Sequence, residues 1–403
     1  MVASTQLTGA EPGKGTPTGL SKGLDLNVWI TGLISLFTDI SSEMIVPVLP
    51  LFMVNVLGVA ATSVGMIEGL AESTASILKV FSGYISDKIG KRKPLMVFGY
   101  GLANVIKPFF ALTNTWEQVM VIRFADRFGK GVRGAPRDAL IADSVPQQFR
   151  GKAFGIQRAM DAFGAAVGPL LAWMVLGLTG NNYRAVFWWS AVPGALAIAA
   201  LLFGLKEKPS VRKADAKPPR LDIRSFGRRF MLFSIGSTIF ALGNSSDAFL
   251  ILRAQNLGMA AAVIPLAYFM FKIVTTVTSM PLGIVSDRIG RRPVLVGGYV
   301  TFAIIYLGFA RATAGYQVWL LFAVYGLYLA ATDGVLRAYV ADIVPSSGRA
   351  TAIGTINALT GIATLPASVA AGYLWQHVGP AAPFYLGGAL AAVSALWLVL
   401  FNL

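Results

Sequence analysis

Five charged residues stand out among those that lie in mostly apolar stretches of the sequence. Asp39 and Glu43 are four residues apart and so share one face of a helix, and Glu72, Arg127 and Lys130 occupy two other such stretches. In such a setting a carboxylate can take up and release a proton, and a cation can hold a negatively charged group. We therefore predict that these five residues form a proton-coupling and substrate cavity.

The number of charges in the first part of the chain predicts a paired network and not a bare cationic pore. A charge at mid-bilayer costs about 2.5 to 3.5 kcal/mol even on insertion scales, so it needs a partner or water. Away from the ends of the apolar stretches between residues 28 and 178 lie seven acids and eight bases: Asp39, Glu43, Glu68, Glu72, Asp126, Asp138 and Asp161, with Lys79, Lys107, Arg123, Arg127, Lys130, Arg133, Arg137 and Arg158. An alternative role for Asp39 and Glu43 is only to neutralise Arg127 or Lys130.

The chain that positions these charges has the composition of a membrane protein. It has 403 residues, 55% of them hydrophobic and 13% charged, and its mean hydropathy is +0.64. A helix needs about 20 mostly apolar residues to cross a bilayer core of roughly 30 Å. Twelve stretches are candidates: 28–55, 63–85, 94–113, 116–142, 151–178, 183–205, 229–252, 260–285, 293–311, 315–341, 350–375 and 381–402. We predict an all-α integral membrane protein with twelve transmembrane helices.

The formal net charge of +15 is distributed as membrane orientation requires, and not as nucleic-acid binding would require. Nine lysines and arginines, against three acids, fall between residues 206 and 229. The positive-inside rule puts this loop and both termini in the cytoplasm. We predict a multi-pass protein of the cell (inner) membrane. There is no cysteine, His377 is the only histidine and no phosphate-binding loop occurs, so we predict neither a metal nor a cofactor.

An internal repeat divides the chain into two units. Residues 83–92 match residues 283–292 at an offset of 200, and Ser41-Ser42-Glu43 answers Ser245-Ser246-Asp247. Repeated helical units are common in transporters. We predict four regions: a disordered cytoplasmic tail at 1–24, a six-helix bundle at 25–205, a basic cytoplasmic linker at 206–228 and a second, pseudo-symmetric six-helix bundle at 229–403.

Each unit carries the pattern Gly-x-x-x-Asp-[Arg/Lys]-x-Gly-[Arg/Lys]-Arg after its second predicted helix. The first glycine allows close helix approach, and the aspartate ends a helix where it can meet a helix N-terminus or a basic group. The pattern resembles the loop motif of the major facilitator superfamily, and the resemblance extends over residues 28–402. It implies that the two loops are cytoplasmic latches that hold the outward-facing state, with these residues: Gly83, Asp87, Gly90, Arg92, Gly283, Asp287, Gly290 and Arg292.

Two further segments are similar to the twelve-helix drug and proton antiporters of that superfamily. Asp39 followed by Pro-Val-Leu-Pro at residues 47–50 resembles the first helix of the group. Residues 127–135 resemble the Arg-x-x-Gln-Gly pattern of its fourth helix, with Lys130 in place of the glutamine. The resemblance implies a secondary active transporter, monomeric and not an enzyme, that works by alternating access with proton-coupled antiport.

Gly164, Gly168 and Pro169 are similar to the gating motif in the fifth helix of exporters, with Ala172 in place of a final glycine. Two glycines four residues apart let a neighbouring helix pack closely, and the proline allows a bend. The resemblance therefore implies efflux of a small organic solute. Three alternatives stay open: an organic-anion or phosphorylated-metabolite carrier, which Lys130 and the other cations near it favour, a membrane-embedded enzyme using paired carboxylates, and a substrate-sensing receptor.

Overall fold

The computed structural model describes residues 24–207, 226–345 and 348–403. Within these ranges the regular elements are all helical, and they form twelve passages whose ends lie within four residues of the predicted stretches. The prediction of an all-α fold with twelve membrane helices in two bundles is confirmed. The predicted tail at 1–24 and linker at 206–228 fall for the most part outside the described residues.

The first six passages form the N-terminal bundle, which we call the N half. Its helices are α1 (Leu26–Ile45), α2 (Leu49–Asn55), α3 (Ala61–Ile89), α4 (Lys93–Ile106), η2 (Lys107–Leu112), α5 (Trp116–Ser144), η3 (Gln147–Phe149), α6 (Arg150–Leu178), α7 (Tyr183–Trp189), α8 (Ala191–Ala199) and η4 (Ala200–Gly204). The first passage is broken between α1 and α2 at Pro47, which has no N–H to donate and disfavours helix at the residue before it.

The last six passages form the C-terminal bundle, which we call the C half. Its helices are α9 (Gly227–Gly243), α10 (Ala248–Asn256), α11 (Ile264–Ile289), α12 (Arg291–Arg311), α13 (Gly315–Ile343), α14 (Arg349–His377) and α15 (Ala382–Leu400). The break between α9 and α10 corresponds to the break between α1 and α2, so the first passage of each half is interrupted.

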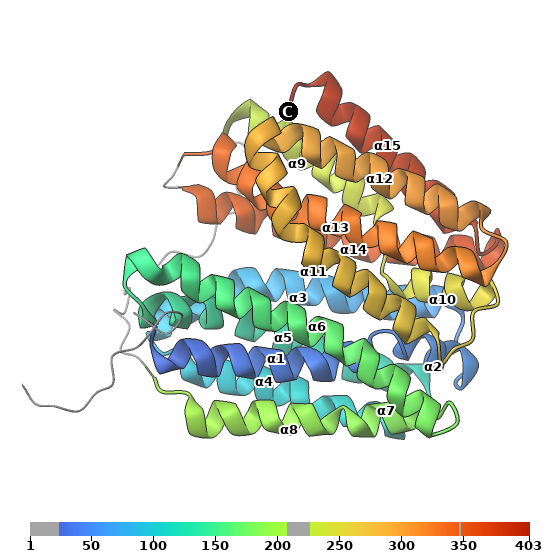
Figure 1. The fold of residues 1–403 in the computed structure, drawn as a ribbon, viewed down its shortest axis with the longest axis horizontal. Coiled ribbons are helices and arrows are strands. Elements are labelled where there is room, and N and C mark those ends of the chain that lie inside the picture. Colours follow the sequence, from blue (N-terminus) through green and yellow to red (C-terminus); the bar gives the residue numbers. More distant parts are fainter. Residues whose placement is uncertain (1–23, 208–225, 346–347) are drawn as a thin grey trace, which may run out of the picture.

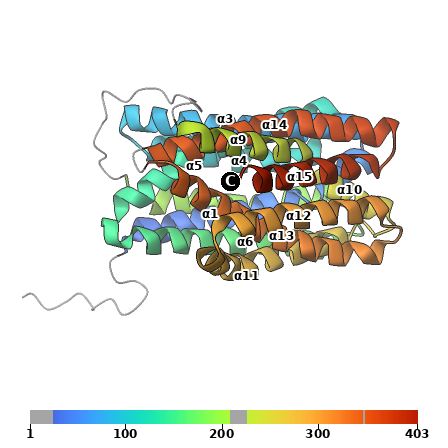
Figure 2. The ribbon, with the colours of Figure 1, turned by 90° about the horizontal axis from the view of Figure 1, so that it is seen from above.

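Figure 1 shows the C half above the N half, and in Figures 1 and 2 the helices of both run along the long axis. We call the end that carries the loops at 83–92 and 283–292 the loop end, and the opposite end the far end. In Figure 1 the halves converge at the far end, on the right, where α10 and α11 contact α2, α3 and α6. They diverge toward the loop end, on the left.

The far end is sealed by close packing of α3 against α14. A Cβ added to Gly65 of α3 would lie 2.1 Å from the backbone oxygen of Ser368, and one added to Gly372 of α14 would lie 2.6 Å from the oxygen of Ala61. Neither contact leaves room for a side chain. The two backbones approach so closely only because both positions are glycine.

Ten passages within the described residues are long and apolar enough to cross a membrane by length and composition. The two that are not among these ten are α3 and α5, which carry Glu68, Glu72, Arg123 and Arg127. Both helices are central to the N half and pack on each other. Their polarity therefore marks the interior of the bundle and not a departure from the membrane fold.

Candidate functional site

A chain of ion pairs crosses the interior of the N half between α3 and α5. Arg123 of α5 binds Glu68 of α3 at 2.7 Å, and Arg127, one turn further along α5, binds Glu72 at 3.1 Å. Arg127 Nε also lies 3.3 Å from Asp126 Oδ2. The two acids of α3 are spaced by one turn, as the two arginines of α5 are, so the helices match pair by pair. The side chains of Arg127 and Asp126 are only 5% and 6% exposed.

Among the described residues, one ion pair joins the two halves. Lys272 Nζ of α11 lies 3.2 Å from Glu43 Oε1 of α1, and both side chains are mostly buried. Lys272 also lies over the rings of Tyr268 and Phe271, at 5.0 and 5.3 Å from their centroids, where cation–π attraction holds it. Glu43 Oε2 is buried and accepts no hydrogen bond within the described part of the chain. The charge of Glu43 is thus balanced mainly from the opposite half.

Asp247 stands beside this pair, in the break between α9 and α10. It accepts hydrogen bonds from the hydroxyls of Tyr325 at 2.8 Å and Tyr268 at 3.2 Å, and Lys272 is the nearby cation that acts on it most strongly. Sequence reasoning did not single out Asp247 or Lys272 as site residues. The internal repeat could have identified them. Asp247 occupies the position in the second unit that corresponds to Glu43, and Lys272 lies 200 residues after Glu72, which is the offset of the repeat.

Asp39 and Lys130 lie near these pairs without joining them. Asp39 is half-buried on α1, and Lys130 of α5 is exposed. Among the described residues neither makes a hydrogen bond or an ion pair. The charges that act on Asp39 come from α6, α5 and α1: Asp161, Arg133, Glu43 and Lys130. Asp39 therefore differs from Glu43 and Glu72, which each hold a cation.

Gly164 and Gly168 of α6 pack directly on the two acids of α1. A Cβ on Gly164 would lie 3.2 Å from Asp39 Cβ, and a Cβ on Gly168 would lie 2.7 Å from Glu43 Cβ. Pro169 follows inside α6. The segment predicted as a gating motif thus sets how closely α6 approaches the acids, a contact between distant segments that spacing along the chain does not reveal.

The loop at residues 83–92 is held within the N half. Arg92 binds Asp87 at 2.7 Å and reaches Asp143 of α5 at 3.5 Å. Gly90 ends α3 with a φ of 70°, a backbone conformation that glycine adopts at little cost. Gly83 lies close to α5, because an added Cβ would be 3.3 Å from the Cβ of Ala135.

The loop at residues 283–292 repeats this arrangement with a shift of one residue. Asp287 forms an ion pair with Arg291, which also reaches Asp342 of α13 at 3.5 Å. Arg292, the residue predicted to act in the latch, instead donates to the backbone oxygens of Leu398 and Val399 near the end of α15. Gly290 has a φ of 98°, as the loop's turn requires, and Gly283 has open space around it.

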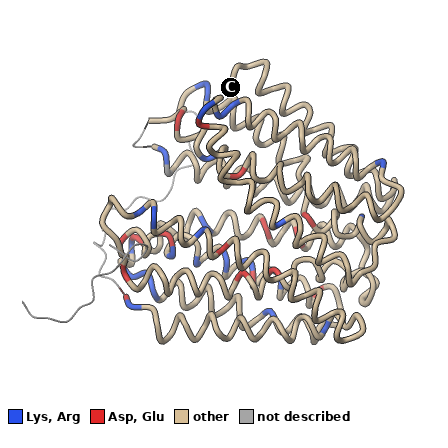
Figure 3. Tube along the Cα trace, in the orientation of Figure 1, with Lys and Arg blue, Asp and Glu red and all other residues tan. Residues whose placement is uncertain are grey.

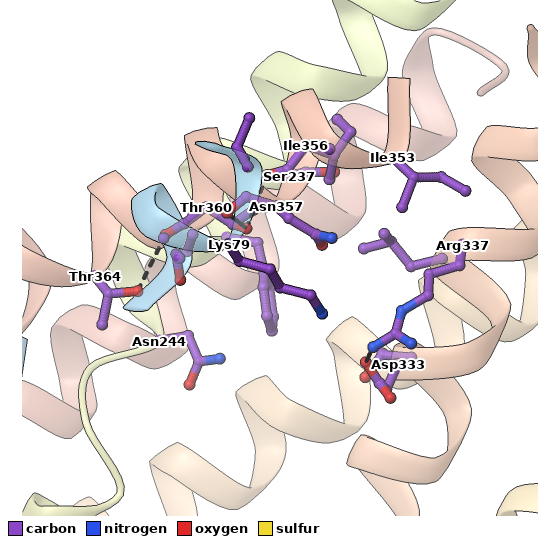
Figure 4. Close-up of a pocket in the computed structure, with 18 of the residues that line it drawn as sticks. Lys79, Ser237, Asn244, Asp333, Arg337, Ile353, Ile356, Asn357, Thr360 and Thr364 are labelled. Carbon is purple, nitrogen blue, oxygen red and sulfur yellow. Dashed lines mark hydrogen bonds and ion pairs between the residues drawn. The ribbon is translucent and has the colours of Figure 1, made fainter. Parts of the chain in front are cut away.

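A cavity of about 900 Å³ lies between the halves and extends to the loop end. Figure 4 shows its wall, with Lys79 from α3 and with Asp333 and Arg337 from α13. None of the five predicted cavity residues is among those that line it in the described part of the chain. They lie beyond its inner end: Glu72, for example, is one turn of α3 further toward the far end than Ser76, which does line it.

The sequence matches the Major Facilitator Superfamily over residues 31–253 and again over residues 232–403. An uncharacterized MFS-type transporter of Methanocaldococcus jannaschii is 40% identical over 382 residues, covering 93% of this chain and 95% of that protein. A multi-drug resistance efflux pump of Streptococcus pneumoniae is 26% identical over 389 residues, covering 92% of this chain and 94% of the pump.

Solved structures share the fold at low sequence identity. A POT family transporter in complex with 5-aminolevulinic acid has a TM-score of 0.77 and 13% identity, with 93% of this chain and 95% of that chain covered. A D-xylose-proton symporter has a TM-score of 0.72 and 15% identity, with 92% and 96% covered. Identities this low indicate the same fold and carry no information about what is transported.

Proposed function

The chain belongs to the Major Facilitator Superfamily and is a multi-pass membrane transporter, and from this premise we propose that it exports a small organic solute in exchange for protons. The observation that carries the proposal is the ion pair between Glu43 and Lys272, which links the halves through a group that can be protonated. In alternating access the halves rock against each other around a central site. A proton that changes a contact between the halves can therefore drive that motion.

Proton uptake by Glu43 removes the charge that holds Lys272 across the interface. Two further carboxylates interact with Lys272: Glu72 of the N half, which already holds Arg127, and Asp247, which belongs to the same half as Lys272. In exchange for an exported solute, the proton enters while the far end is open, when the cation has its partner in the C half. It leaves from the loop end, and Glu43 and Lys272 then pair as in this structure and hold the far end closed while the solute binds. Asp39 lies on the same face of α1 as Glu43 but forms no ion pair among the described residues. We propose that it is a second group that takes up and releases the coupled proton.

The proposed direction is export, and the loop end is proposed to face the cytoplasm. The basic residues at 206–229 support this orientation through the positive-inside rule. The cavity then opens inward, where an exporter collects its solute. The similarity to a multi-drug resistance efflux pump of Streptococcus pneumoniae and the segment with Gly164, Gly168 and Pro169 support export. In this proposal the protein acts as a monomer in the cell membrane.

The test uses purified protein in liposomes with Glu43→Gln, Asp39→Asn and a control, Glu117→Gln, which neutralises an exposed acid at the far end. We expect the first two variants to lose uphill transport driven by a pH gradient and to keep downhill exchange, because an amide resembles a protonated acid. The control should behave as wild type. Loss of both transport modes together with thermal stability would mean that the acids only neutralise nearby cations, and the proposal would then fail.

A further inference from the structure

We infer that the transported solute is an organic anion whose acid group binds at Lys79 and Arg158 in the cavity between the halves. The inference rests on the proposed function in one respect, because it takes this cavity as the place where the solute binds before export. It goes further by naming the class of solute and two binding residues, neither of which belongs to the ion-pair network of α3 and α5.

The charges that line the cavity are not balanced. Three basic residues and two acids line it, and both acids already hold an arginine at 2.7 and 2.9 Å: Asp333 pairs with Arg337, and Asp138 pairs with Arg137. Lys79 and Arg158 remain, exposed to the cavity and without an ion pair or hydrogen bond to any residue in the described ranges. Both come from the N half, Lys79 from α3 and Arg158 from α6.

The surroundings of Lys79 strengthen this excess of positive charge. Figure 4 shows its side chain extending from α3 into the cavity, toward Arg337 and Asp333 on the opposite wall. The charge that acts most strongly on Lys79 is Asp138, which already holds Arg137, and the next three are cations: Arg137, Arg337 and Arg158. Both acids of the lining are already paired, so the uncompensated charge of the cavity is positive, and an excess of one sign within low-dielectric walls concentrates ions of the opposite sign. The cavity therefore favours a negatively charged solute.

Closure of the loop end does not remove the excess. If the halves approached, Lys79 would meet Asp333 across the cavity, as in a gate. Asp333 is the only acid that the C half contributes to the lining described, and its pairing with Lys79 would release Arg337. Arg158 would still have no partner. With the loop end open or closed, the cavity has more cations than acids. A contact between Lys79 and Asp333 leaves this excess in place, whereas a bound anion neutralises it.

The rest of the lining fits the body of an organic acid. Apolar side chains of Leu329, Leu336 and Ile353 lie on the walls, and Asn244 and Asn357 offer amide groups. A cavity of about 900 Å³ is within the range of roughly 300 to 1,000 Å³ found for small-molecule sites. We therefore describe the solute as amphiphilic, with an apolar body along α13 and α14 and an acid group toward α3 and α6.

The experiment exploits the absence of cysteine from the full chain. A single Asn357→Cys places a thiol in the cavity, and Ala260→Cys places one in an exposed segment between α10 and α11 at the far end as the reference. Each is labelled with the anionic sulfonatoethyl and the cationic trimethylammonioethyl methanethiosulfonate. We expect the anionic-to-cationic rate ratio at residue 357 to exceed that at residue 260 by about tenfold, as one uncompensated charge gives at short range.

Three substitutions in the Asn357→Cys protein then assign the effect. Lys79→Gln and Arg158→Gln should each reduce the rate ratio several-fold, and Lys79→Arg should keep it. Lys91→Gln removes the same charge from an exposed position near the loop end that does not line the cavity, and should change nothing. Should Asn357→Cys fail to fold, Thr351→Cys, also on the cavity wall, repeats the measurement.

Protection from labelling links the charge to ligand binding. Naphthalene-1-sulfonate should slow labelling of Asn357→Cys in the wild-type background and not in Lys79→Gln, while naphthyltrimethylammonium should not slow it. An equal rate ratio at residues 357 and 260, no protection by the sulfonate, or protection by the ammonium compound would overturn the inference. Labelling needs no proton gradient, so these outcomes are independent of the Glu43→Gln test: either proposal can fail while the other stands.

Discussion

The two halves repeat one fold and fill it with different chemistry. Between α3 and α5, the N half holds buried ion pairs such as that of Arg127 with Asp126. The C half is filled by aromatic rings, with Phe240 stacked on Tyr299 at 4.0 Å between ring centroids. Figure 3 shows charges throughout the interior of the N half, whereas those of the C half gather mostly near the loop end. The repeat therefore preserves helix positions and loops, while the interiors have diverged.

The two kinds of interior respond differently to substitution. A buried ion pair is stable only while both partners are present, because removal of one leaves an uncompensated charge. An aromatic contact adds roughly 0.5 to 1.5 kcal/mol on top of the burial of its rings, and losing one leaves no charge behind. We therefore expect the N half to be sensitive to single neutralisations that the C half tolerates.

The largest difference is expected between Arg127→Ala and Arg337→Ala. Arg127 is 5% exposed, so its loss should lower the free energy of unfolding by about 3 kcal/mol. This destabilisation is at the lower end of the range for a broken buried ion pair, because Arg123 still lies 3.5 Å from Asp126 and partly compensates its charge. Arg337 is 35% exposed and its loss should cost under about 1 kcal/mol. Thermal unfolding of the purified variants measures both.

A conservative variant separates charge from geometry at the same position. Arg127→Lys keeps the charge but not the two-pronged guanidinium, so we expect it to recover most of the stability and little of the transport. Similar losses of stability in Arg127→Ala and Arg337→Ala would show that the two halves do not differ in the way proposed.

Much of the fold was predictable because it follows from local properties of the chain. The twelve apolar stretches give the helices, and even α3 and α5, which are too polar for a hydropathy criterion, are recognised by comparison with their apolar surroundings. The repeat of residues 83–92 at 283–292 gives the two halves. These features depend on composition and spacing along one segment at a time.

The details of the site were not predictable because they depend on contacts between distant segments. The Glu43–Lys272 pair joins helices of different halves, and the sequence offered Arg127 and Lys130 as partners that were nearer along the chain. The aligned position of Arg292 suggested a latch role, but the start of α12 turns its neighbour Arg291 toward Asp287. The cavity is displaced from the predicted acids because the halves diverge only beyond Ser76.

A smaller effect on stability is expected when a methyl group is added to a glycine at a close helix contact, either within the N half or between the two halves. In the N half, Gly168→Ala would place a Cβ 2.7 Å from Glu43 Cβ and 2.8 Å from the oxygen of Ile40, at a cost of about 1 to 3 kcal/mol in unfolding free energy. Gly372→Ala instead strains the packing that closes the far end. We expect it to favour the state in which the far end is open and the loop end is closed. Slower labelling of Asn357→Cys, which lines the cavity at the loop end, would report this shift.

Gly177→Ala is the control for both, because it lies on α6 with open space around it. Alanine is a better helix former than glycine by up to about 1 kcal/mol, so this variant should be as stable as wild type or slightly more so. Equal destabilisation by Gly168→Ala and Gly177→Ala would indicate that close packing on α1 is not what the glycine provides.

The smallest effect on stability, and the last test of the comparison, is expected at the two loops. Asp87 is 36% exposed and its partner Arg92 only 7%, whereas Asp287 and Arg291 are 61% and 26% exposed. Water screens the second pair more, so Asp287→Asn should change the free energy of unfolding by well under about 1 kcal/mol, and Asp87→Asn by more.

Both variants should slow transport without weakening solute binding, because neither residue lines the cavity. Asp87→Asn should slow it more, and the double variant most of all, since each half then loses its own loop contact. Glu117→Gln, which neutralises an exposed acid outside either loop, should leave transport unchanged. A larger effect of Asp287→Asn than of Asp87→Asn would mean that the more exposed loop controls the motion, and the burial of Arg92 would then not explain how the halves differ.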